Sequence, residues 1–239
     1  MVDKLLILLT LLISANLSAQ QGDNSIIVLE LFTSQGCSSC PPADELLDRI
    51  KYNNENQDVY VLSYHVDYWN RLGWRDPFSN SMFSDYQREY AQQFNSRSIY
   101  TPQLVVNGRE HFTGSNEYKV TAALEQYSQS KPSNTILLQN IKKTNVMIQL
   151  DYKVQGGDFD RITLALVVSE RITDISRGEN RNRMLKNTNI VANRIVTQQD
   201  YGEVSIKIPD WIEDSDQLSI ITYTQDTDLK TTGASRYRL

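Results

Sequence analysis

The sequence predicts an α/β domain with a helical insertion, followed by a β-sandwich-like domain, and three patterns carry this prediction. Residues 26–32 form an apolar run of strand length, and residues 43–50 repeat apolar side chains at helical spacing. A second strand over residues 59–64 completes a β–α–β unit. Beyond residue 131, short strand-forming segments alternate with polar turns, which is typical of a β-sandwich.

The rest of the first domain follows the second strand. An aromatic stretch over residues 65–78 has neither a helical nor a strand period and predicts a loop. Asn107 and Gly108 suit the central positions of a type I′ turn, so the segments on either side should form an antiparallel hairpin. The elements expected after the loop are a helix, the two hairpin strands and a closing helix, at residues 79–95, 103–106, 109–113 and 116–129.

The second domain is expected to begin at Lys131-Pro132-Ser133. The first domain would then cover residues 20–130 and the second residues 131–239. Six strand-forming segments follow the boundary, at residues 135–138, 146–152, 162–169, 189–196, 203–208 and 218–224.

The amino terminus indicates export. Lys4 is followed by an apolar run over residues 5–13 and then by small and polar residues through Ala19. This pattern predicts a signal peptide over residues 1–19, because the run is too short to span a bilayer. We therefore expect a periplasmic or secreted protein with no membrane span after signal removal. The net charge of −5, with both signs interspersed, gives no polybasic patch and predicts no nucleic-acid partner.

The chain has two cysteines, Cys37 and Cys40, at a predicted strand-to-helix turn. The pattern places Cys37 at the helix mouth and Cys40 one turn inside. The positive end of a helix stabilises a thiolate, which is the reactive form of cysteine, so the motif predicts a redox-active disulfide. A structural disulfide is one alternative. Another is copper bound by both cysteines and His65, whereas His65 and His111 lack the spacing of a zinc finger.

Three further residues are candidates for support of the dithiol. Glu30 lies on the preceding strand and is a candidate proton acceptor for Cys40, although a salt-bridged or surface role is equally open. His65 and Asp67 follow the second strand, at the sheet edge where α/β sites gather. His65 would stabilise the thiolate or serve as an ordinary hydrogen-bonded histidine.

The sequence around the cysteines resembles the DUF1223 family of exported bacterial thioredoxin-like proteins. The resemblance lies in residues 30–44, 64–69, 72–74 and 100–103, and it extends to residues 178–181. It implies a thioredoxin-like fold in which Pro102 is a cis-proline packed beside the disulfide. Thr101 would then offer its backbone to a substrate chain, whereas in the plainer interpretation Pro102 only opens a strand.

The activity expected is that of a thiol-disulfide oxidoreductase, with Cys37 attacking and Cys40 resolving the mixed disulfide. Its partners would be exported protein or peptide thiols and a redox partner protein, with no cofactor and no metal. The residues leave open whether it reduces, oxidises or isomerises. The alternative is a non-enzymatic binding or copper-handling protein. The segment 178–183 is a solvated loop or reaches over to the first half of the chain.

Overall fold

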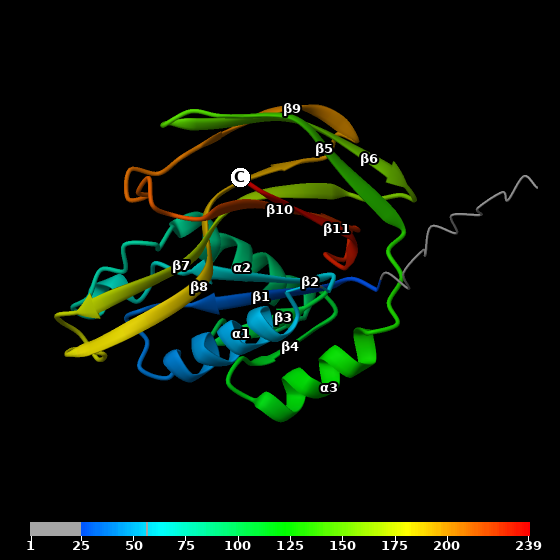
Figure 1. Ribbon diagram of the computed structural model, residues 1–239. Helices are drawn as coiled ribbons and strands as arrows, with labels where there is room; N and C mark the ends of the chain where they lie inside the picture. Colours follow the sequence, from blue (N-terminus) through cyan, green and yellow to red (C-terminus); the bar gives the residue numbers. More distant parts are fainter. Residues whose placement is uncertain (1–24, 56) are drawn as a thin grey trace, which may run out of the picture.

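The computed structural model describes residues 25–55 and 57–239, and these form two β-sheets and three α-helices (Figure 1). The larger sheet has eight strands in the order β11-β10-β7-β8-β2-β1-β3-β4, and the smaller has the order β5-β6-β9. The predicted signal peptide lies outside the described residues. No helix in the described part of the chain is long and apolar enough to cross a membrane.

The larger sheet contains β1 (Ile27–Thr33), β2 (Val59–His65), β3 (Gln103–Val106), β4 (Glu110–Thr113), β7 (Arg161–Ile175), β8 (Arg183–Thr197), β10 (Leu218–Gln225) and β11 (Thr231–Arg238). The smaller sheet contains β5 (Asn134–Lys143), β6 (Met147–Gly156) and β9 (Tyr201–Lys207). The helices are α1 (Pro41–Asn53), α2 (Ser81–Gln93) and α3 (Glu117–Tyr127), with a short 3-10 helix at Asn70–Leu72.

The predicted fold class, an α/β thioredoxin-like domain followed by a β-sandwich-like domain, is wrong. Strands from both halves of the chain share the larger sheet, in which β8 lies beside β2 through the parallel pair of Ser63 and Ile190. The described chain is mainly β, and its three α-helices are too few for a helix-rich α/β domain. Local periodicity locates strands, but it holds no information about the pairing of strands that lie far apart in the sequence.

Each face of the larger sheet packs on a different neighbour because successive strand residues point to opposite faces. In β1, Leu29 and Leu31 point to the face that α1 and α3 cover. Val28 and Phe32 point to the other face, where α2 packs with residues of β2, β7 and β10. A third core lies between the smaller sheet and β7, β8 and β10. Packing on both faces of the sheet therefore holds in place the edge at which β1 and β2 end.

The predicted hairpin is confirmed. Gln103–Val106 pairs antiparallel with Glu110–Thr113, and Asn107 and Gly108 both have positive φ, at 48° and 63°. A Cβ at Gly108 would lie 1.8 Å from the carbonyl oxygen of Leu229, so the close approach as well as the turn requires glycine.

The β7–β8 hairpin connects the two halves of the molecule. Both strands have 15 residues and pair antiparallel along most of their length. In Figure 1 they run from beneath the smaller sheet down to the level of α1, where their joined ends extend beyond the rest of the sheet. This length brings the connecting residues 176–182 close to the end of β1, where the cysteines lie.

Candidate functional site

Cys37 and Cys40 form a disulfide between the end of β1 and the start of α1. Two turns lead into the helix, since Ser34 O accepts from Cys37 N at 3.1 Å and Cys37 O accepts from Cys40 N at 3.2 Å. The helix begins at Pro41, so Cys40 is its N-cap. The prediction that Cys40 lies one turn inside the helix is therefore wrong, because the two prolines that follow Cys40 occupy the first positions of the helix.

Both cysteines are completely buried, with 0% of each residue exposed, whereas Ser38 and Ser39 between them are exposed. The position at the helix mouth therefore does not leave Cys37 open to solvent, because the loop after β2, the Thr101–Pro102 segment and the β7–β8 loop pack around the turn. The Ser39 hydroxyl lies 3.4 Å from Cys37 Sγ. Pro41 and Pro42 have no N–H group, so the first two residues of the helix offer the sulfurs no backbone donor.

Trp69 connects the cysteine turn to the predicted cis-proline segment. A Cβ at Gly36 would lie 3.1 Å from Cβ of Trp69, so the tryptophan packs directly on the residue before Cys37. The indole Nε1 of Trp69 donates to the Thr101 hydroxyl at 2.8 Å. The aromatic loop after β2 thus covers one side of the disulfide.

The peptide bond between Thr101 and Pro102 is cis, as the family resemblance implies. Pro102 is buried, and its carbonyl accepts from Gly114 N at 3.0 Å. A Cβ at Gly114 would lie 3.3 Å from Cβ of Ala43 in the first turn of α1. Thr101 and Pro102 are therefore linked to the cysteine turn from two sides, through Trp69 and through Gly114.

The loop between β7 and β8 reaches over to the cysteines, as one of the two interpretations of segment 178–183 predicts. The Asn180 side-chain amide donates to Gln35 O at 2.9 Å and to Cys37 O at 3.0 Å. A Glu179 carboxylate oxygen accepts from Ser38 N at 3.2 Å. Both ends of the peptide unit between Cys37 and Ser38 are thus held by this loop.

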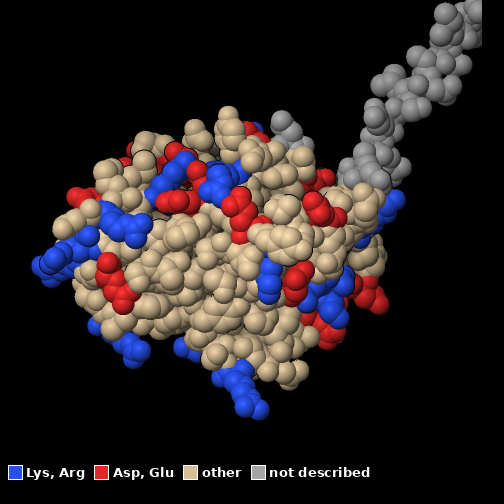
Figure 2. Space-filling model, turned by 90° about the horizontal axis from the view of Figure 1, so that it is seen from below, with Lys and Arg blue, Asp and Glu red and all other residues tan. Residues whose placement is uncertain are grey.

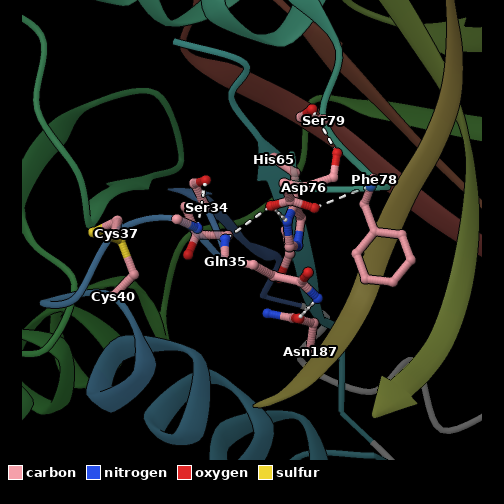
Figure 3. A network of polar contacts seen from close by, with 12 residues as sticks. Ser34, Gln35, Cys37, Cys40, His65, Asp76, Phe78, Ser79 and Asn187 are labelled. Carbon is pink, nitrogen blue, oxygen red and sulfur yellow. Dashed lines mark hydrogen bonds and ion pairs between the residues drawn. A yellow bond between two sulfur atoms is a disulfide. The ribbon is translucent and has the colours of Figure 1, made fainter. Parts of the chain in front are cut away.

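A buried polar network lies behind the turn (Figure 3). One carboxylate oxygen of Asp76 lies 2.7 Å from Nδ1 of His65 and accepts from Gln35 N at 2.8 Å, and the other accepts from Phe78 N. The Gln35 side chain extends the network by donating to Asn187 Oδ1 at 2.9 Å. Figure 3 shows Ser34 and Gln35 between the disulfide and the His65–Asp76 pair, so these two residues separate His65 from the cysteines.

Asp44 adds a second buried carboxyl on the α1 side of the sheet. The Thr33 hydroxyl donates to Asp44 Oδ2 at 3.1 Å, while Oδ1 has no hydrogen-bond partner among the described residues. Burial raises the pKa of Asp44 to about 7, against the opposing effects of His65 and the Thr33 hydrogen bond. A carboxyl with this pKa exchanges protons near neutral pH.

His65 shares the electrostatic environment of the two carboxyls. Burial lowers the pKa of His65, but the charge and hydrogen bond of Asp76 and the charge of Asp44 raise it more, and the net direction is upward. Its Nε2 atom is buried without a partner among the described residues. Asp44 and His65 are therefore coupled electrostatically, and Asp76 lies in the same buried group.

Glu30 and Asp67 lie apart from this group. Glu30 faces the opposite side of the sheet from α1, where it accepts hydrogen bonds from the hydroxyls of Tyr86, Tyr90 and Tyr223, and burial raises its pKa. Side chains alternate along a strand, so Glu30 points away from the face of the sheet on which α1 and Cys40 lie. Asp67 is partly exposed and accepts from the Ser84 hydroxyl of α2.

Several site residues have no strong signal in the sequence. Asp44 follows Cys40 by four positions, which predicts the same helix face, but an acidic residue in a first helical turn is common. The segment Gly178-Glu179-Asn180-Arg181 stands out only through the family resemblance. Asp76, Gln35 and Asn187 join the site through long-range contacts that no local pattern predicts.

The described residues contain no group of three or more His, Cys, Asp and Glu side chains placed to hold a metal ion. A large cavity of about 950 Å³ lies elsewhere, beside α1 and the carboxyl-terminal strands, and neither cysteine is part of its lining. The disulfide lies outside this cavity, so the cavity gives no support to a redox function of the cysteines.

Comparison with solved structures gives matches that include an extended one. The crystal structure of protein AGR_C_4864 from Agrobacterium tumefaciens is 28% identical, covers 88% of this chain and 92% of its own chain, and superposes with a TM-score of 0.60. A DUF3823 family protein from Bacteroides ovatus is 14% identical over 44% of this chain and 52% of its own, with a TM-score of 0.25 that supports no argument.

A search of curated proteins found no match. The sequence profile of the family described as "Protein of unknown function (DUF1223)" matches residues 28–225, which include the cysteine turn, the Thr101–Pro102 segment and the β7–β8 loop. The match covers most of the chain, and the protein therefore belongs to the DUF1223 family.

Proposed function

We propose that the protein is a thiol-disulfide oxidoreductase that acts on protein or peptide thiols of an exported compartment through Cys37 and Cys40. The observation that carries the proposal is a disulfide whose turn is linked through Trp69 to Thr101, with Asp44, a buried carboxyl of pKa about 7, one helical turn after Cys40. A disulfide with a purely structural role needs neither the Thr101–Pro102 segment nor Asp44 near it. A bridge that closes a loop of only four residues also adds little constraint to a chain with three buried cores.

In the reductive direction, the Cys37 thiolate attacks one sulfur of a substrate disulfide. The substrate S–S bond breaks, its second sulfur leaves as a thiolate with the electron pair, and a mixed disulfide with Cys37 forms. The Cys40 thiolate then attacks Cys37 Sγ, the bond from Cys37 to the substrate breaks, and the first substrate sulfur leaves as a thiolate. The substrate gains two electrons and two protons, and a redox partner protein with a dithiol reduces Cys37–Cys40 again. Oxidation of a substrate is the same sequence in reverse.

Asp44 is the group suited to take the proton of Cys40. Residues at i and i+4 lie on the same helix face, and helical side chains lean toward the N-terminus, so the carboxyl of Asp44 leans toward Cys40. The unpartnered Oδ1 atom is free to accept a proton. This role replaces the one expected of Glu30, which faces the other side of the sheet.

Trapping of mixed disulfides tests the proposal. A Cys40→Ser variant should accumulate adducts through Cys37, because the resolving thiol is absent, and a Cys37→Ser variant should accumulate few. The purified protein should also reduce insulin or oxidise a model dithiol peptide. If neither variant captures a protein in cells and the purified protein does neither reaction, the proposal is wrong. A reduced form that binds stoichiometric Cu(I) and exchanges no thiols would favour copper handling instead.

A further inference from the structure

Two loops beside the disulfide carry an unusual concentration of arginine. The first follows β2, and the second connects β7 to β8. Together with the first residue of β8, they hold five exposed arginines: Arg71, Arg75, Arg177, Arg181 and Arg183. The whole chain has a net charge of −5, so a local excess of positive charge is contrary to its overall balance.

The two loops are in contact with each other and with the cysteine turn. A Cβ at Gly178 would lie 3.0 Å from Cβ of Trp74, which fixes one loop against the other. The indole Nε1 of Trp74 donates to Gln35 Oε1 at 3.1 Å. Asn180 binds Cys37 O from the second loop. The two loops that carry the arginines are therefore both held against the cysteine turn, and in Figure 2 blue side chains, with some red ones among them, lie at the left edge, on the side where Figure 1 shows the joined ends of β7 and β8.

The positive charge of this rim is not neutralised within the described part of the chain. None of the five arginines takes part in the ion pairs found there. The two loops contribute one exposed carboxylate, Glu179, which accepts the Ser38 backbone N–H, and Asp174 at the end of β7 is a second exposed carboxylate beside them. Arg183 donates to Asn180 Oδ1, a neutral acceptor that orients the amide toward Cys37. The other arginines are available to a partner.

We propose that this arginine rim is the docking surface for the partner polypeptide, and that the partner carries Asp or Glu residues close to its reactive cysteine. The proposal rests on the proposed function for its assumption that the partner contains a thiol or disulfide. Guanidinium groups bind carboxylates in pairs of parallel hydrogen bonds, which orients as well as attracts. A charged rim also raises the rate of encounter with an oppositely charged partner.

The test uses three blocked peptides of equal length in which one cysteine is flanked by aspartate, serine or lysine. Each peptide reduces the oxidised full-length protein at low ionic strength, and each rate is divided by that peptide's rate with neutral 2-hydroxyethyl disulfide. This division removes the effect of neighbouring charge on thiol reactivity itself. The aspartate peptide should be at least about tenfold faster than the serine peptide, with the lysine peptide slower, and 0.5 M salt, about a 4 Å Debye length, should remove the difference.

Variants assign the effect to the rim. Arg177→Gln together with Arg181→Gln should bring the aspartate peptide close to the serine peptide. Arg109→Gln, in the exposed β3–β4 turn at the other end of β1, should leave the ratio unchanged. Equal rates for the three peptides with the unaltered protein, or an Arg109→Gln effect as large as that of the double variant, would overturn the proposal.

A binding measurement separates this proposal from the proposed function. A peptide with serine in place of its cysteine cannot exchange disulfides, and its binding can be followed by tryptophan fluorescence. If the aspartate form binds in an Arg177- and Arg181-dependent manner while no peptide exchanges thiols, the docking surface stands and the oxidoreductase proposal fails. Arginine also binds phosphate, so a uridine oligomer serves as the nucleic-acid competitor. If it binds the same arginines more tightly than the aspartate peptide does, the assignment of the rim to a polypeptide partner is wrong.

Discussion

Asp44 follows Cys40 by one turn of α1, and its backbone N–H donates to Cys40 O at 3.1 Å. The two residues therefore share a helix face, with the carboxyl leaning toward the cysteine. Both are buried, and the pKa of Asp44 is about 7. A proton released by Cys40 has an acceptor in the same buried region, and this arrangement leads to the first prediction.

The Asp44→Asn variant should slow resolution of the mixed disulfide by about tenfold or more above pH 7, since a positioned general base contributes at least this factor. In the unaltered protein the rate of resolution should rise with an inflection near pH 7, and the variant should lack that inflection. Stopped-flow measurement of mixed-disulfide decay from pH 5.5 to 9 provides the comparison. Glu30→Gln is the matched control, and a lost inflection in that variant would return the role to Glu30.

The same substitution should change the pH dependence of stability. The pKa of Asp44 is 3.8 in the unfolded reference and about 7 in the folded protein, so the folded chain holds a proton that the unfolded chain has lost between these values. This contribution to stability is complete below pH 3.8 and disappears as the pH rises through about 7. Urea unfolding at pH 4.5 and pH 8 should therefore show a smaller decrease in stability for Asp44→Asn than for the unaltered protein.

Asp76→Asn should lower the pKa of His65, because the Asp76 charge is the largest of the effects that raise it. It should also destabilise the fold by about 3 kcal/mol, since removal of one member of a buried ion pair leaves the other uncompensated. NMR titration of the imidazole protons measures the first effect. His111 is the internal reference because it pairs with Tyr100 on a different part of the chain, and its titration should stay unchanged.

Ser39→Ala should make Cys37 of the reduced protein less reactive. The Ser39 hydroxyl lies 3.4 Å from Cys37 Sγ, and a hydrogen bond to a charged group contributes about 1.5 kcal/mol, which is roughly tenfold in rate. The pH midpoint of Cys37 alkylation by iodoacetamide should move upward. Ser38→Ala changes the neighbouring exposed serine, so an equal effect from that variant would show that loop flexibility, and not the hydrogen bond, is responsible.

Asn180→Ala should speed chemical reduction of the disulfide. The substitution removes hydrogen bonds to Gln35 O and Cys37 O and should reduce stability by about 1 to 3 kcal/mol. Reduction by tris(2-carboxyethyl)phosphine should become at least about tenfold faster as the turn opens more often. Asn193→Ala removes an amide that binds Lys207 O on the other side of β8. If that control speeds reduction equally, general destabilisation explains the result.

The sequence predicts the elements of this protein better than their assembly. The hairpin at Asn107-Gly108 and the cysteine turn between β1 and α1 follow from local turn chemistry and from helical spacing, and both are present. The strand segments after residue 131 are also strands, although β7 and β8 extend well beyond their expected bounds and β11 was not expected. The division into two architectures fails because β8 pairs beside β2, a contact that no local pattern contains.

The sequence likewise predicts some residues of the candidate site and not others. The family resemblance places Thr101 and Pro102 at the site, and the hydrogen bond from Trp69 to Thr101 links them to the cysteine turn. Glu30 illustrates the limit, because its distance along the chain from Cys40 suggests proximity while the alternation of β1 places it on the other face. The sequence pattern does not show that the buried carboxyl on the cysteine side of the sheet is Asp44, on α1, and not a residue of β1.

The bond from Asn180 to Gln35 joins residues 145 positions apart, and this separation orders events during synthesis. Cys37 and Cys40 are translated long before the hairpin that later encloses them, so a nascent chain displays both thiols to any oxidant it meets. Only after the β7–β8 segment has been made and paired does the sulfur pair leave solvent. The same two sulfurs thus pass from an open chain to a site in which both cysteines are completely buried.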